Sequence, residues 1–340
     1  MKAITIQKPG QVLICDVPKP ELHFGEALLK PLYGGICGSD LNAYRGTMAY
    51  FSYPRIPGHE FSARIEEIAE NDRGFQVGDI VICNPYFNCG KCYTCRQNKV
   101  NVCMNNQTMG VQRDGAFAEF VVMPIERLIH GKNLSPKTLA LIEPFCIGLH
   151  GVQRAHITSS DRVLVIGAGT IGLSAAIAAK ARGASVYLTD ISPRKLEYGM
   201  RYHLDGTFIN KNETHFAQKV MQLTQGEGFD VAIEAVGLPS TFQNCLDAAA
   251  YGGRVVVIGV GKKNIDLNFT VIQKKELKVF GARNALTVDF ESLIDIIINQ
   301  NLQLEQVITN VYSFDKAGQA FADFDHDSGN MLKVMIDFTT

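Results

Sequence analysis

The chain has 340 residues, and its 33 lysines and arginines nearly balance 34 aspartates and glutamates, for a formal net charge of -1. This length predicts about two domains, and the near-neutral charge excludes nucleic acid as a main partner because it provides no basic footprint for phosphates. Hydrophobic residues make up 46% and charged residues 20% of the chain, which excludes a disordered or collagen-like protein.

The sequence carries no sign of secretion or membrane insertion. The longest uncharged apolar run, residues 163–179, contains three glycines and falls just short of the length that spans a bilayer. The N-terminal segment lacks the apolar core and cleavage site of a signal peptide. We therefore expect a cytoplasmic protein without membrane contact. In that reducing compartment its nine cysteines favour metal binding over disulfides.

Residues 1–147 predict an irregular, mostly β domain. Their apolar runs are short, rich in β-forming residues and interrupted by glycine and proline. Such runs occupy residues 2–7, 11–17, 61–68, 79–85 and 117–123.

Candidate metal ligands lie in the sequence CGSD at residues 37–40, in GHE at residues 58–60 and at Glu143. A lone cysteine, histidine or glutamate is usually a core or solvated residue. Together these residues offer a thiolate, an imidazole and carboxylates, which suit a catalytic zinc with one position left open. Asp40 could fix the tautomer of a ligating imidazole, and Ser39 could relay a proton from a metal-bound oxygen.

A second cluster contains four cysteines within fifteen residues, at Cys89, Cys92, Cys95 and Cys103. Four thiolates at this spacing can surround a tetrahedral zinc, although an iron–sulfur cluster or a nucleic-acid-binding zinc module would use similar spacing. The segment has few basic residues and no recognition helix, which favours a structural zinc loop. Its only basic residues are Lys91, Arg96 and Lys99.

From residue 162 the pattern changes to buried strands that alternate with helical stretches, which predicts βαβ units and a doubly wound parallel sheet. The expected strands are 162–167, 185–190, 207–210, 231–236 and 254–259, and the expected helices are 170–181, 193–203 and 214–224. After about residue 281 the regularity stops. Helical patterns at 289–300 and 316–324 and a last apolar run at 331–338 then close the chain, and we expect this segment to return to the first domain.

The strand at 162–167 runs directly into a GxGxxG fingerprint made by Gly167, Gly169 and Gly172, with Ile171 inside it. In this context the glycines predict a tight turn, close approach of a pyrophosphate to the helix N-terminus and close helix packing. The next strand ends in Asp190, eighteen residues after Gly172, where a carboxylate can bind a ribose 2′-hydroxyl and repel a 2′-phosphate. This favours NAD over NADP. Arg194 and Lys195 are positively charged and could instead bind a 2′-phosphate.

In this order, the motifs resemble those of the zinc-containing medium-chain alcohol dehydrogenases. The resemblance covers essentially the whole chain. Within this family the motifs are similar to those of the polyol and sugar-acid branch, which includes sorbitol, threonine and L-galactonate or L-gulonate 5-dehydrogenases. It rests on GICGSD at 35–40, PGHE at 57–60, the four-cysteine loop, DGAFAEF at 114–120, IEPF at 142–145 and the GAGTIG fingerprint with Asp190.

For the fold, the resemblance implies an α/β protein with two domains. Residues 1–148 and 284–340 would form a GroES-like, β-rich catalytic domain. Residues 149–283 would form a Rossmann domain, inserted between them. The resemblance also implies two zinc ions per chain, NAD as cofactor and assembly into a homodimer or homotetramer.

For the site, the resemblance implies a catalytic zinc on Cys37 and His59, with Glu60 as a further ligand. Glu143 would either bind this zinc or hold its water. Liver-type alcohol dehydrogenases have a cysteine where Glu143 falls, so the chain departs from that branch and agrees with the polyol branch. The implied reaction is hydride transfer from a secondary alcohol to NAD, with Ser39 passing the proton of the alcohol outward.

The resemblance also suggests substrate ligands. Arg283 and Asn284 fall where polyol dehydrogenases place an arginine that reaches substrate and nicotinamide, and Arg113 could add a second positive charge for a carboxylate. The segment FSYPR at 51–55 is similar to that of the L-galactonate and L-gulonate enzymes. We therefore expect a hexonate as substrate, with a neutral polyol or a 2-amino-3-hydroxy acid such as L-threonine as alternatives.

Two other classes of function remain open from the sequence. One is a reductase or accessory protein of the same fold that works without catalytic zinc, and the other is a zinc-containing binding protein without turnover. The joint presence of Cys37, His59, Glu60 and Glu143 argues against the first. NADH production with any alcohol would exclude the second.

Overall fold

The computed structural model describes residues 1–261 and 263–340, which divide into two compact units. Unit 1 comprises Met1–Glu143 and Leu286–Thr340, and unit 2 comprises Pro144–Ala285. The predicted boundaries at 148 and 283 therefore lie a few residues inside unit 2. The first boundary is displaced because α4 (Ile142–Arg154) is one continuous helix that passes from one unit into the next.

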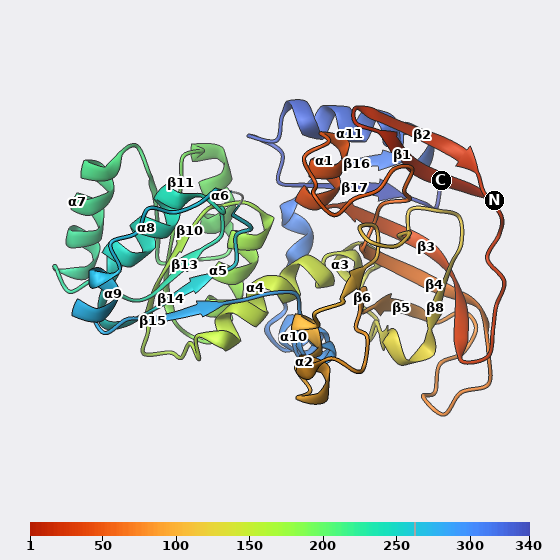
Figure 1. Ribbon diagram of the computed structural model, residues 1–340, viewed down its shortest axis with the longest axis horizontal. Helices are drawn as coiled ribbons and strands as arrows, with labels where there is room; N and C mark the ends of the chain where they lie inside the picture. The colour runs from red at the N-terminus through yellow and green to blue at the C-terminus, as the bar shows by residue number, and fades with distance from the viewer. Residues whose placement is uncertain (262) are drawn as a thin grey trace. The chain divides into compact units, whose positions relative to one another are not determined.

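Unit 1 is built on a seven-stranded sheet (Figure 1). Its strand order is β16-β17-β3-β4-β5-β9, with β8 also paired to β3, and two-stranded sheets β1-β2 and β6-β7 lie beside it. The strands are β1 (Lys2–Lys8), β2 (Gln11–Asp16), β3 (Glu26–Ile36), β4 (Glu60–Ile68), β5 (Ile80–Cys83), β6 (Tyr86–Phe87), β7 (Gln107–Thr108), β8 (Val121–Pro124), β9 (Leu128–His130), β16 (Ile308–Ser313) and β17 (Lys333–Asp337).

The two ends of the chain share one core in unit 1. Strand β17 pairs antiparallel with β3, with Val334 opposite Ile36, so the last strand completes the sheet of the N-terminal segment. Ile4, Ile36 and Phe321 belong to the same buried cluster. The helices of this unit are α1 (Gly38–Tyr44), α2 (Tyr93–Arg96), α3 (Pro136–Ala140), α10 (Thr287–Gln300) and α11 (Ala317–His326). The expected return of the C-terminal segment is thus present in the structure.

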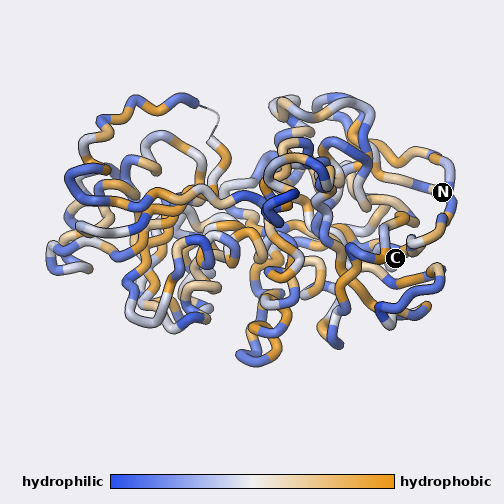
Figure 2. The backbone as a smooth tube through the Cα atoms, turned by 60° about the horizontal axis from the view of Figure 1, so that its bottom comes forward, coloured by the Kyte–Doolittle hydropathy of each residue, from blue (hydrophilic) through white to orange (hydrophobic). Residues whose placement is uncertain are grey.

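Unit 2 contains a six-stranded parallel sheet in the order β12-β11-β10-β13-β14-β15, and its strands are largely hydrophobic (Figure 2). The strands are β10 (Arg162–Ile166), β11 (Ser185–Asp190), β12 (Gly206–Ile209), β13 (Phe229–Glu234), β14 (Ala249–Val257) and β15 (Lys278–Gly281). The helices between them are α5 (Thr170–Ala181), α6 (Pro193–Arg201), α7 (Glu213–Thr224), α8 (Pro239–Ala248) and α9 (Thr270–Lys274).

The order of the parallel strands fixes where this unit can bind a ligand. The chain runs from β10 outward to β11 and β12 and then returns to place β13 on the other side of β10. Such a reversal leaves a crevice at the carboxyl ends of the two central strands, where open α/β sheets bind their ligands. The loops after β10 and β13 therefore become the candidate cofactor region.

Within the described ranges, no helix is both long enough and apolar enough to cross a bilayer.

Candidate functional site

The first group of candidate metal ligands lies where β3 ends and β4 begins. Donor atoms of Cys37, His59 and Glu60 lie within 4.8 Å of one another. Antiparallel pairing of β3 with β4 puts Gly35 opposite Glu60. A Cβ added at Gly35 would lie 2.2 Å from a carboxylate oxygen of Glu60, so only glycine leaves space for that side chain. His59 and Glu60 are buried and Cys37 is half-buried, which leaves one side of the group accessible.

Asp40 and Ser39 lie beside this group. The Oδ2 atom of Asp40 accepts a hydrogen bond of 2.9 Å from the backbone N–H of Cys37. Its Oδ1 atom lies 4.0 Å from Nδ1 of His59, and neither of these two buried atoms has a hydrogen-bond partner among the described residues. The same holds for the buried Oγ of Ser39. An imidazole held at its other nitrogen by a metal would turn Nδ1–H toward Asp40.

Glu143, at the start of α4, is also buried and accepts a hydrogen bond from the hydroxyl of Tyr86. Burial raises the pKa of Glu143 to about 7. Glu143 does not belong to the group of three close donors that the described residues form. Sequence analysis missed Tyr86, because a single aromatic residue in a short strand carries no signal for a polar contact.

Sequence analysis also missed Lys333, the first residue of β17. Its Nζ atom lies 2.5 Å from Oε2 of Glu60, and the side chain is only 2% exposed. Burial acts to lower the pKa of Lys333, but the neighbouring charges of Glu60 and Cys37 outweigh it, so the pKa is raised. The lysine is 273 residues away from Glu60 in the chain, and only the pairing of β17 with β3 brings the two together.

The charges of this group fit a divalent cation. Burial acts to lower the pKa of His59, but Cys37 and Asp40 outweigh it, so the pKa lies well above its ordinary value. Among the described residues Lys333 pairs with Glu60 in this acidic group, and a proton on His59 would add a second positive charge. A zinc ion supplies that charge instead when thiolate, neutral imidazole and carboxylate are the ligands.

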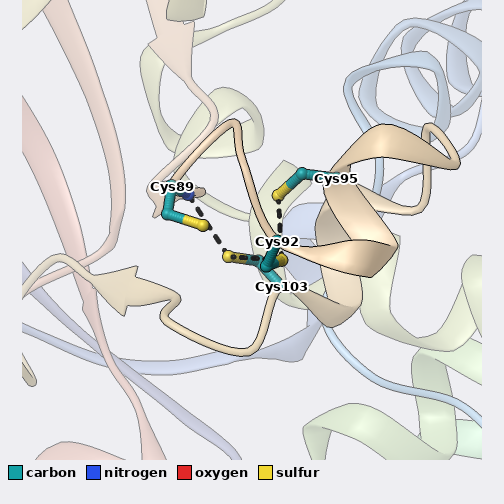
Figure 3. Close-up of side chains that lie close together, drawn as sticks. All are labelled: Cys89, Cys92, Cys95 and Cys103. Carbon is teal, nitrogen blue, oxygen red and sulfur yellow. Dashed lines mark hydrogen bonds between the residues drawn. The ribbon is translucent and has the colours of Figure 1, made fainter.

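The four-cysteine cluster forms a second group that could hold a metal ion (Figure 3). Its four thiols lie within 4.8 Å of one another, with Sγ of Cys92 3.4 Å from Sγ of Cys95 and 3.8 Å from Sγ of Cys103. These separations are too long for disulfides, and they match thiolates about 2.3 Å from a central zinc. A hydrogen bond from Thr94 and backbone N–H groups lower the pKa of Cys92 to about 5, which favours the thiolate.

We expect Cys92→Ser to destabilise the protein while sparing its chemistry. Loss of one thiolate removes zinc from this loop, and structural zinc contributes directly to folding free energy. The thermal unfolding midpoint should fall by roughly 5–10 °C. Zinc content should drop by one ion per chain, and turnover at 25 °C should persist. Cys15→Ser, which changes a half-buried thiol outside both metal groups, is the control. An unchanged midpoint for Cys92→Ser would contradict a structural role.

The predicted fingerprint lies between β10 and α5. Gly167 has a φ of 106°, a left-handed value that glycine adopts readily. A Cβ at Gly172 would lie 1.8 Å from the carbonyl oxygen of Gly167, so the turn and the helix require both glycines. Gly169 is the N-cap of α5, and a Cβ there would meet no atom within 4 Å. This open cradle of backbone N–H groups at a helix N-terminus fits a pyrophosphate.

Asp190, at the end of β11, is hydrogen-bonded to the fingerprint turn. Its Oδ2 atom accepts a 2.6 Å bond from the N–H of Ala168, and its Oδ1 atom accepts a 2.8 Å bond from the N–H of Ser192. The backbone N–H of Lys195 lies 3.3 Å from the hydroxyl oxygen of Ser192, the N-cap of α6. The carboxylate is thus held at the carboxyl end of β11 by the fingerprint turn and by the loop before α6. Apolar side chains are exposed after β11, β13 and β14, at Ile191, Val236, Leu238 and Val260.

The three expected substrate ligands belong to two different units of the structure. Arg283 and Asn284 belong to unit 2. Arg113 belongs to unit 1, and its guanidinium lies 3.6 Å from the centre of the Phe87 ring. Burial lowers the pKa of Arg113, with opposing contributions from Asp114 and Glu26. The loop that carries Arg113 packs on the segment before His59, since a Cβ at Gly110 would lie 2.6 Å from the backbone nitrogen of Gly58 and a Cβ at Gly115 would lie 2.3 Å from the carbonyl oxygen of Pro57.

Comparison with known proteins gives concordant matches along the chain. The family described as "Alcohol dehydrogenase GroES-like domain" matches residues 23–133, and that described as "Zinc-binding dehydrogenase" matches residues 170–299. An L-galactonate-5-dehydrogenase from Escherichia coli is 32% identical over 96% of this chain and 98% of its own length. An L-threonine 3-dehydrogenase from Pyrococcus horikoshii is 35% identical over 94% of each chain.

Among solved structures, a dehydrogenase from Escherichia coli CFT073 has a TM-score of 0.91 and 30% identity over 99% of both chains. It is described as a short chain alcohol dehydrogenase and was solved with NADH. The relatives match at more than 30% identity over nearly the full length, and the two family matches fall on the two halves of the fold. The chain therefore belongs to the zinc-type medium-chain alcohol dehydrogenase family.

Proposed function

We propose that this oxidoreductase transfers a hydride from a secondary alcohol of a sugar acid to NAD and yields a keto acid. The observation that carries the proposal is the close group of Cys37, His59 and Glu60, whose donor atoms lie within 4.8 Å of one another. We assign these residues to hold a catalytic zinc, with Glu143 either as a further ligand or as the residue that would hold the water of the zinc. The second zinc would lie on Cys89, Cys92, Cys95 and Cys103.

The residues of unit 1 suit the handling of a proton at this site. When bound, zinc supplies a Lewis acid that lowers the pKa of an alcohol, and NAD accepts the hydride. The Oγ of Ser39, buried and without a partner among the described residues, is placed to take the proton of the alcohol and pass it outward. Asp40 holds the Cys37 turn through its backbone N–H, and Tyr86 holds Glu143.

We assign cofactor binding to the residues at the carboxyl edge of the parallel sheet. The N-terminus of α5 would receive the pyrophosphate, and Asp190 would accept hydrogen bonds from the ribose. Exposed apolar side chains after β11, β13 and β14 suit the flat rings of a dinucleotide. The full set of proposed cofactor residues is Gly167, Gly169, Ile171, Gly172, Asp190 and Lys195.

A preference for NAD over NADP of about 100-fold in kcat/KM is expected, because a 2′-phosphate would lie against the carboxylate of Asp190 and such repulsion costs several kcal/mol. Asp190→Asn should reduce this preference by about tenfold, since the charge is removed and the side chain keeps its size. Parallel initial rates with both cofactors measure the ratio. A wild-type enzyme that uses NADP as well as NAD would refute the assignment and shift attention to Arg194 and Lys195.

The substrate class is a hexonate in this proposal, with Arg283 and Asn284 as its ligands. The support is the similarity to an L-galactonate-5-dehydrogenase and the presence of a guanidinium, which suits a carboxylate. The similarity to an L-threonine 3-dehydrogenase keeps an amino acid alcohol as the second candidate. Arg113, whose guanidinium lies 3.6 Å from the centre of the Phe87 ring, is proposed as a second positive charge for the carboxylate.

The decisive experiment measures NAD reduction at 340 nm with hexonates, polyols and L-threonine, on protein of known zinc content. Two zinc ions per chain and activity with a sugar acid would support both the activity and the substrate class. Activity confined to polyols or L-threonine would keep the zinc- and NAD-dependent chemistry and refute the hexonate. One zinc per chain without turnover would overturn the proposed enzyme.

We also propose that the protein is a dimer, or a dimer of dimers, formed through the edge of the parallel sheet. Strand β15 is an edge strand, with Val279 exposed on it. Unpaired edge N–H and C=O groups favour pairing with a second strand. Light scattering coupled to size-exclusion chromatography should give at least twice the chain mass of 37.4 kDa. A monomer at micromolar concentration would contradict this assembly.

A further inference from the structure

A buried carboxylate that takes no part in the proposed chemistry lies at the carboxyl end of β13. Glu234 is 1% exposed. Its Oε1 atom accepts hydrogen bonds from the backbone N–H groups of Val236, at 2.9 Å, and Gly237, at 2.8 Å, and from the hydroxyl of Thr241, at 2.7 Å. Burying a carboxylate is costly unless several donors offset the loss of water. Here all three donors come from the loop after β13 and the first turn of α8.

This loop lies directly against the fingerprint turn. A Cβ at Gly167 would lie 2.6 Å from a methyl carbon of Val236, and a Cβ at Gly172 would lie 3.3 Å from Cβ of Ala235. The strands that precede the two segments, β10 and β13, are neighbours in the sheet, on either side of the point where the strand order reverses. Displacement of the loop would therefore change the shape of the crevice in which a dinucleotide would lie.

The end of a third strand, β14, packs against the same carboxylate. Gly259 follows β14, and a Cβ there would lie 2.4 Å from Oε2 of Glu234 and 2.3 Å from the backbone nitrogen of Gly237. The backbone N–H of Gly259 also donates to the carbonyl of Glu234. Glu234 thus holds its own loop by hydrogen bonds and packs against the end of the next strand, while Val236 and Leu238 remain exposed on the loop.

We infer that Glu234 is a positioning residue for cofactor binding. Its carboxylate fixes the loop 235–238 against the fingerprint turn, so that the exposed apolar side chains of the loop are ready to receive the dinucleotide. A preorganised loop binds its ligand more tightly, because the loop has already lost its conformational entropy before binding. The inference rests on the proposed function, since it takes NAD as the ligand of unit 2.

The test compares NADH affinity in two variants of the same strand. Glu234→Gln keeps the shape of the side chain and removes the charge on which three donors converge. Its matched control is Asp230→Asn, at the other end of β13, where Asp230 accepts a 2.8 Å bond from the backbone N–H of Arg162. Fluorescence titration with NADH is done at a temperature well below the unfolding midpoint of each holoenzyme. The Kd of Glu234→Gln should be about tenfold higher than that of wild type, which is a loss of about 1.4 kcal/mol in binding free energy. Asp230→Asn should stay within twofold of wild type.

A second variant keeps the test usable if Glu234→Gln does not fold. Thr241→Val removes one donor to the same carboxylate, and its Kd for NADH should rise by about threefold. Equal Kd values for wild type, Glu234→Gln and Thr241→Val would overturn the inference. An equal loss of NADH affinity in Asp230→Asn would also overturn it, because a general effect on stability would then explain the result. Failure of the wild-type protein to bind NADH would instead overturn the proposed function itself.

Discussion

Cys37→Ser should abolish NAD-dependent turnover while the protein stays folded and continues to bind NADH. The substitution replaces a thiolate by a neutral hydroxyl in a group of three close donors among the described residues, so the catalytic zinc should be lost. Lewis-acid stabilisation by a metal is worth several kcal/mol, which corresponds to a fall in kcat/KM of about a thousandfold. NADH binding should remain within about twofold of wild type, because the proposed cofactor residues lie in unit 2.

Zinc analysis and kinetics on the same samples test this expectation. The variant should retain one zinc per chain, on the four-cysteine loop. The matched control is again Cys15→Ser, which removes a thiol of β2 that accepts a hydrogen bond from Gln7 and should leave activity and zinc content unchanged. If Cys37→Ser kept two zinc ions and its activity while Cys92→Ser lost turnover, the roles of the two metal sites would have to be exchanged.

Lys333→Met should lower the unfolding midpoint more than any other single loss of an ion pair in unit 1. The substitution leaves Glu60 buried without its cation, and removal of one partner from a buried pair costs about 3–5 kcal/mol. A loss of about 3 kcal/mol corresponds to a fall of roughly 6–12 °C. Lys333→Arg, which keeps the positive charge, should be less destabilised than Lys333→Met.

The control for this variant is the same change in an exposed ion pair. Lys132 lies 2.6 Å from Asp295, and both side chains are about half exposed. Surface pairs of this kind contribute about 1 kcal/mol or less, so Lys132→Met should shift the midpoint by no more than about 2–4 °C. Differential scanning calorimetry on chelator-treated proteins, in which no zinc faces Glu60, gives both values. Equal unfolding midpoints for Lys333→Met and Lys132→Met would contradict the prediction, because the buried pair with Glu60 would then stabilise the protein no more than the exposed pair.

Several parts of the fold could be predicted from the sequence because their signals are local. The strand at 162–167 and the helix at 170–181 correspond to β10 and α5, since an uninterrupted apolar run followed by a glycine fingerprint has few other structures available. Helix α8 (Pro239–Ala248) was not predicted. Its hydrophobic periodicity is broken by polar residues, and its stability comes from packing against β13 and β14 instead.

For the candidate metal ligands, too, the sequence predicts the local contacts, and the fold sets those between distant residues. The four cysteines lie within one short loop, so their spacing alone predicts a common site, and the structure brings all four together. His59 and Glu60 are adjacent in sequence, but their meeting with Cys37 depends on the pairing of β3 with β4. The choice between Glu60 and Glu143 as the closer donor also depends on this pairing, because the two carboxylates are 83 residues apart in the chain.

The sequence by itself determined the family, the two zinc motifs and the dinucleotide fingerprint, because each is a set of chemically specific residues at short and fixed spacing. Only the tertiary structure decided the contacts of Lys333 with Glu60, of Tyr86 with Glu143 and of Glu234 with its loop. Each of these is a buried polar group whose partners the packed backbone selects. A charged or polar residue in the sequence does not reveal whether folding will bury it, because burial is set by strands and loops that meet from distant parts of the chain.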